Sequence, residues 1–81
     1  MNPIMAIKVN GRTAIAPLVQ EILTKYGCNI KTRVGFHETT EDQCSMDGIL
    51  ILQLFGPKAE INAMFAELGK LDGVTPKFIE F

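Results

Sequence analysis

The spacing of apolar residues in the first third of the chain predicts a strand followed by a helix. Ile4–Val9 is apolar except for one lysine, and the turn dipeptide Asn10-Gly11 follows it. Six apolar residues then recur every three or four positions, the pattern of one helix face: Ile15, Leu18, Val19, Ile22, Leu23 and Tyr26. Thr13 suits the N-cap of this helix, and Gly27 suits the left-handed position after its last turn.

The middle of the chain predicts two strands joined by a long loop. Ile30–His37 alternates between two sets of side chains, as a half-buried strand does. Glu38–Asp47 is polar and acidic and is expected to be the loop of a hairpin. Ile49–Phe55 follows as a strand that is apolar on both faces, and Gly56-Pro57 ends it.

The last third predicts a second helix and a final strand. Ile61, Met64, Phe65 and Leu68 form a second helical face, for which Pro57 suits the first helical position. Gly73 ends this helix, and Val74–Phe81 is the last strand. Pro76 cannot donate a hydrogen bond to a neighbouring strand, so this strand is expected at a sheet edge.

The resulting order is β-α-β-β-α-β, which predicts an α+β, ferredoxin-like sandwich. Its antiparallel sheet would have four strands, with two helices on one face. The 81 residues have room for one domain, residues 1–81.

The central strand raises the question of what covers the other face of the sheet. Side chains alternate along a strand, so one of two apolar sets must face away from the helices. These sets are Leu50, Leu52 and Leu54, or Ile49, Ile51 and Phe55. A contiguous apolar patch is uncommon on a monomer, which predicts a homodimer or higher homo-oligomer. The alternative is a solvent-exposed face partly covered by Lys and Glu stems.

Charge and composition narrow the class of partner. The net charge is −1 and the pI is about 5.7, which argues against direct binding of nucleic acid. No apolar stretch approaches the ~20 residues that cross a bilayer, so no membrane association is expected. The two cysteines do not form a CxxC motif, and we expect a cytoplasmic protein with reduced thiols.

Two short segments resemble ACT domains. The first closes a helix with Tyr26-Gly27-Cys28-Asn29-Ile30, and the second is Leu71–Val74 before the last strand. A narrower match, Arg33–Glu38, Cys44 and Gly48–Gly56, resembles a small stand-alone ACT-like family labelled as regulators of the iron-only hydrogenase system. The resemblance implies a βαββαβ fold, oligomerisation through the sheet or its edges, and a regulatory role.

The same resemblance suggests a ligand site. ACT domains bind small effectors at subunit interfaces near the turn after the first strand, a turn that Asn10, Gly11 and Arg12 occupy here. An amino-acid-binding turn of this type carries an acidic residue, a proline and a glycine. This chain has Arg12-Thr13-Ala14 instead.

A second candidate ligand site lies on the strand Ile30–His37. Arg33, Gly35 and His37 share one face, so two cationic or ionisable side chains flank a glycine. That arrangement suits a small anionic effector such as a carboxylate or phosphate. The alternative is an ion pair with Glu38 or Glu80, or a contact between subunits.

His37 and Cys44 also form a candidate metal site, because imidazole and thiolate suit zinc, nickel or copper. Further ligands would come from Glu38, Asp42 or Asp47, or from a second subunit. The alternative is a strand-end histidine and a loop cysteine that bind no metal.

No motif indicates catalysis. The chain has no GxSxG, no HExxH and no glycine loop that cradles phosphate, and we expect a protein that is not an enzyme. The leading hypothesis is a regulatory or sensor module that homo-oligomerises and binds a small ligand at a subunit interface. The alternatives are a metal-binding protein that uses His37 and Cys44, and a ligand-free protein-interaction subunit.

Overall fold

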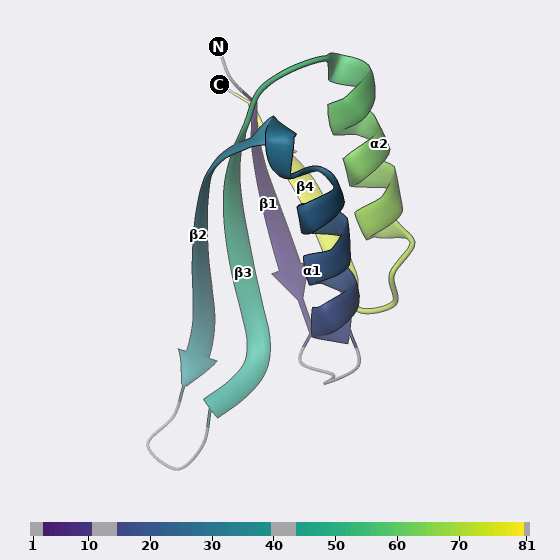
Figure 1. Ribbon diagram of the computed structural model, residues 1–81. Helices are drawn as coiled ribbons and strands as arrows, with labels where there is room; N and C mark the ends of the chain where they lie inside the picture. Colours follow the sequence, from purple (N-terminus) through teal and green to yellow (C-terminus); the bar gives the residue numbers. More distant parts are fainter. Residues whose placement is uncertain (1–2, 11–14, 40–43, 81) are drawn as a thin grey trace.

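Strands and helices follow the predicted order along the chain (Figure 1). The computed structural model describes residues 3–10, 15–39 and 44–80, and for residues 37–39 and 44–47 it describes only the backbone. The elements are β1 (Ile4–Val9), α1 (Ile15–Lys25), the 3₁₀ turn η1 (Gly27–Asn29), β2 (Ile30–Thr39), β3 (Cys44–Leu54), α2 (Lys58–Gly69) and β4 (Val74–Ile79).

All neighbouring strands of the sheet run antiparallel, in the order β2-β3-β1-β4, and both helices cover the same face (Figure 1). This confirms the α+β, ferredoxin-like prediction. β3 is central, and β4 lies at an edge as its proline requires.

The register decides which apolar set of β3 meets the helices. Met5 pairs with Leu52 and Ile7 pairs with Leu50 across β1 and β3. Met5, Ile7 and Leu52 have no exposed surface. The helices therefore cover the set that contains Leu50, Leu52 and Leu54, because residues directly opposite in a pair of strands point to the same face. The buried core consists of Met5, Ile7, Val19, Leu23, Leu52, Leu54, Ile61, Met64, Leu68 and Val74.

Both predicted helices are present, with two local corrections. Gly27 does not adopt the left-handed conformation, since Gly56 and Gly73 are the glycines with positive φ in the described ranges. Instead the chain tightens into η1, where the Asn29 N–H donates to the Tyr26 carbonyl at 2.9 Å. Pro57 caps α2 rather than starting it, because its ψ of 135° is extended and the first helical residue is Lys58.

The prediction of a long loop over Glu38–Asp47 is wrong. β2 continues to Thr39, β3 begins at Cys44, and these two residues pair across the hairpin. A hairpin can continue through polar residues because its ladder needs backbone groups, whereas burial sets only the side-chain pattern. Residues 40–43 lie outside the described part of the chain.

Asn29 ties the start of β2 to the connection between β3 and α2. It is 8% exposed, and its side-chain amide donates to the Phe55 carbonyl and to Glu60 Oε2, at 3.3 and 2.8 Å. The Phe55 N–H in turn donates to the Asn29 carbonyl at 3.0 Å. The side-chain amide nitrogen, the backbone N–H and the carbonyl of this buried residue are thus all paired, as burial favours.

Candidate functional site

The face of the sheet away from the helices, called the open face below, has no described element over it (Figure 1). The pairing register places one set of alternate side chains on it: Ile4, Ala6, Lys8, Thr32, Val34, Phe36, Ile49, Ile51, Gln53, Thr75, Lys77 and Ile79. At one end of the open face, the Thr32 hydroxyl lies 3.1 Å from Gln53 Oε1 and donates to it.

Apolar side chains dominate the half of the open face formed by β2 and β3. Phe36, Val34 and Ile49 are 60%, 45% and 44% exposed, and Ile51 lies half-buried among them. In the register, Phe36 pairs with Ile49 and Val34 pairs with Ile51. These four side chains therefore form a contiguous apolar patch. Of the predicted exposed set, Phe55 lies just beyond the end of β3 and is 46% exposed.

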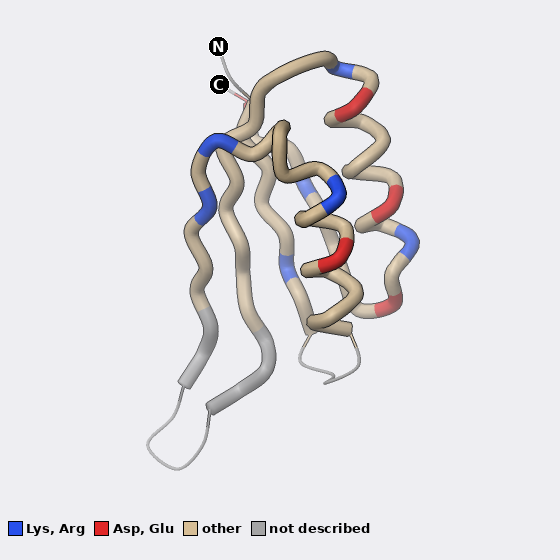
Figure 2. The backbone as a smooth tube through the Cα atoms, viewed as in Figure 1, with Lys and Arg blue, Asp and Glu red and all other residues tan. Residues whose placement is uncertain are grey.

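The other half of the open face is cationic. Lys8 on β1 and Lys77 on β4 border a shallow pocket of about 390 Å³ that Ala6, Ile49 and Thr75 complete. Figure 2 shows acidic residues on the helices and connections, and none on the strands where side chains are described, that is, outside residues 37–39 and 44–47. The open face thus has an aromatic and aliphatic half beside a half that carries two lysines.

The turn predicted as an effector site is only partly described. Asn10 is exposed directly after β1, and its N–H donates to the Gly73 carbonyl at 2.8 Å. Gly11 and Arg12 lie outside the described residues. The site at this turn stays a prediction.

The three residues of the second predicted ligand site occupy alternate positions of β2. Arg33, Gly35 and His37 pair with Leu52, Leu50 and Gly48, so the register gives them the side of the sheet that carries the helices. Arg33 is exposed because β2 is an edge strand, and a Cβ on Gly35 would lie 3.2 Å from a Leu50 methyl group. The structure describes only the backbone of His37. Positions 33 and 37 are about 13 Å apart along the strand, so two adjacent contacts to one small anion are not expected there.

The side chains of the predicted metal site, His37 and Cys44, are not among those that the structure describes. His37 pairs with Gly48 and Cys44 pairs with Thr39, both through the backbone. Among the side chains that are described, no three His, Cys, Asp or Glu residues gather as metal ligands would. Metal binding by His37 and Cys44 stays a prediction.

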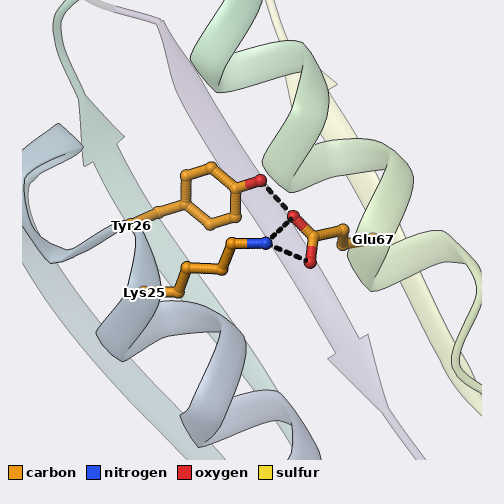
Figure 3. A network of polar contacts seen from close by, with 3 residues as sticks. All are labelled: Lys25, Tyr26 and Glu67. Carbon is orange, nitrogen blue, oxygen red and sulfur yellow. Dashed lines mark hydrogen bonds and ion pairs between the residues drawn. The ribbon is translucent and has the colours of Figure 1, made fainter.

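A polar network that the sequence did not indicate joins the ends of α1 and α2 (Figure 3). Lys25 Nζ donates to both carboxylate oxygens of Glu67, at 3.0 and 3.1 Å, and the Tyr26 hydroxyl donates to the same carboxylate. The hydrogen bond from Tyr26, together with that from Lys25, lowers the pKa of Glu67. The carboxylate in turn raises the pKa of Tyr26 and of Lys25 through the same hydrogen bonds. More than 40 residues separate the partners, so no local spacing in the sequence reveals them.

Fold and surface together define a ferredoxin-like α+β sandwich with one uncovered, largely apolar sheet face. Within the residues described, no helix is both long enough and apolar enough to cross a bilayer.

Comparison with known proteins supports this class. No protein-family model matches the sequence, and no curated protein matches it significantly. The solved structure of an uncharacterized protein from Thermotoga maritima is similar, with a TM-score of 0.81 and 27% sequence identity. The match covers 95% of this chain and 91% of the other.

Proposed function

We propose that this protein is an ACT-like regulatory or sensor module that assembles with copies of itself through the open face. One observation carries the proposal: Val34 and Phe36 on β2 and Ile49 on the central strand β3 form an exposed apolar patch. Covering such a patch releases ~25 cal/mol per Å² of apolar surface removed from water.

The size of the open face suits a small dimer interface. Each of the four strands contributes six residues to the region in which all of them pair. The rise per residue and the spacing between strands give this region of the sheet a flat area of roughly 380 Å². Small interfaces bury about 600 Å² of accessible surface per partner. The accessible area exceeds the flat area because side chains stand out from the sheet, and β2 and β3 extend beyond β1 and β4 (Figure 1).

The two halves of the open face are also complementary to each other. A two-fold axis along the strands, between β3 and β1, would lay β2 over β4 of the second copy and β3 over β1. Lys77 of one copy would then meet Val34 of the other, and Lys8 would meet Ile49. Lysine stems pack well on apolar side chains while their ammonium groups reach the rim, and an isologous interface makes each contact twice.

Regulation follows if a small effector binds the assembled and separated states with different affinity. The resemblance to regulators of the iron-only hydrogenase system supports such a role, in which a shift in assembly changes affinity for a partner protein. The effector site proposed from the resemblance is the turn of Asn10, Gly11 and Arg12, at a subunit interface.

Sedimentation velocity between about 1 and 200 µM tests the assembly, with two lysine variants of matched exposure. Ile49→Lys places a lysine opposite Lys8 of the second copy and should weaken association at least ~10-fold. Leu18→Lys changes a residue on α1 that is 42% exposed, against 44% for Ile49, and should leave association unchanged. A wild-type protein that stays monomeric throughout, or an Ile49→Lys variant that associates like wild type, would refute the proposal.

A further inference from the structure

A second pocket lies at the end of the sheet where β1 begins and β4 ends, beside the first turns of α2. Its volume is about 470 Å³, within the ~300–1,000 Å³ typical of small-molecule sites. Lys58, Ile61, Asn62, Phe78 and Glu80 are among the residues that line it. β1 runs from Ile4 to Val9, so this pocket and the turn that begins at Asn10 lie at opposite ends of the strand.

The apolar wall of the pocket is fixed in place by the core. Ile61 is 5% exposed and belongs to the buried cluster. The Phe78 ring stacks on the Phe65 ring, with centroids 4.6 Å apart and 12° between the planes. A wall held this way needs little ordering when a ligand binds, which favours affinity.

The polar groups of the pocket come from two different elements. Lys58 and Asn62 lie one turn apart on α2, and Glu80 directly follows β4. In the part of the chain that is described, none of these three side chains makes a hydrogen bond or an ion pair with another residue. The lining of the pocket thus includes one cation, one amide and one anion, the groups that a ligand with both charges would require.

We propose that this pocket binds a small zwitterion with an apolar body, that is, an amino-carboxylate. Its carboxylate would accept hydrogen bonds from the Lys58 ammonium and the Asn62 amide, and its ammonium would donate to the Glu80 carboxylate. Its apolar body would rest on Ile61 and Phe78. Hydrogen bonds that involve a charged group are about twice as strong as those between neutral groups. Both charges of the ligand should therefore favour its binding over that of compounds with only one charge.

Three related compounds separate these contributions: L-leucine, 4-methylpentanoate, which lacks the ammonium group, and 3-methylbutylamine, which lacks the carboxylate. In ¹⁵N-¹H NMR titrations, L-leucine should shift the amide signals of Gly56, Lys58 and Asn62. Each singly charged analogue should bind at least ~10-fold more weakly. Equal affinity for all three compounds would overturn the assignment of a zwitterion.

Variants at the polar residues locate the site. Lys58→Met and Glu80→Gln should each weaken L-leucine binding at least ~10-fold, and Asn62→Trp should fill the pocket and abolish it. Lys31→Met, at an exposed position on β2, is the control and should bind like wild type. Circular dichroism confirms that each variant is folded.

The proposal falls if L-leucine causes no saturable shift, if its shifts lie away from the pocket, or if both Lys58→Met and Glu80→Gln bind like wild type. The pocket is contained in one copy of the chain, so Ile49→Lys should still bind L-leucine. Loss of assembly and loss of ligand binding are therefore separate outcomes.

Discussion

At the scale of single residues, Gly56 has the most constrained position among the described glycines. Its φ is +105°, in the region that side chains disfavour, and an added Cβ would lie 2.7 Å from the amide nitrogen of Asn29. That nitrogen is committed to hydrogen bonds with Phe55 and Glu60. A side chain at position 56 would therefore strain the backbone and displace a buried amide nitrogen that donates two hydrogen bonds.

Gly56→Ala should lower the free energy of unfolding by about 1–3 kcal/mol. Urea denaturation measures this change. Gly27→Ala is the matched control, because an added Cβ there meets no atom within 4 Å and its φ is not positive. The control should stay within ~1 kcal/mol of wild type. Equal stability of Gly56→Ala and Gly27→Ala would contradict the strain described here.

At the scale of elements, the Lys25–Tyr26–Glu67 network joins α1 to α2 across the surface of the helical layer. The pKa of Glu67 is lowered from its ordinary value of 4.5, so its contribution to stability is present above that value and is lost as the pH falls through the folded pKa. The pKa values of Tyr26 and Lys25 are raised, so their contribution is lost only as the pH rises through their folded values, above about 10.

Glu67→Gln should accordingly be less stable than wild type near neutral pH. The stability difference between the two proteins should shrink as the pH is lowered from ~7 to ~3. Thermal unfolding at a series of pH values gives this difference. Glu21→Gln, at an exposed position on α1, is the matched control and should be about as stable as wild type near neutral pH. A Glu67→Gln difference that is constant or grows toward acid pH would rule out the network as its source.

Most elements could be predicted from the sequence because burial imposes a period on them. Val19 and Leu23 on α1, and Ile61, Met64 and Leu68 on α2, are buried as their spacing predicts. The hairpin of β2 and β3 was harder to predict because backbone pairing, rather than burial, extends it through polar residues. The sequence also left two exposed sets open for β3, and only the register with β1 decides between them.

The candidate sites were predicted less completely, because their residues come from more than one element. Local alternation placed Arg33 and Gly35 on one side of β2, as the register confirms. Lys58 and Glu80 come from segments that are distant in sequence, and only the fold brings them to one pocket. The periodicity of apolar residues describes one helix or strand at a time. It therefore cannot predict which residues of different elements come into contact.

At the scale of the whole molecule, assembly through the open face should make stability depend on protein concentration. A protein that unfolds from a dimer gains about 2.7 kcal/mol per mole of dimer for each ~100-fold rise in concentration. The wild-type melting temperature should therefore rise by several degrees between about 1 and 100 µM. Differential scanning fluorimetry measures this shift.

The Ile49→Lys variant should show a smaller rise in melting temperature over the same range, because its open face binds a second copy more weakly. Leu18→Lys should retain the concentration dependence of wild type. A wild-type melting temperature that does not change with concentration would contradict a dimer held by the open face.

The first strand of the sheet in sequence order pairs with the last one. β1 and β4 are antiparallel neighbours, Ile4 pairs with Ile79, and the start of β1 and the end of β4 therefore lie at the same end of the sheet (Figure 1). A hairpin turn of about two to five residues is enough to join such strands. Circular permutation should therefore preserve the strand order, and the sequence can be opened at another connection while every strand keeps its neighbours.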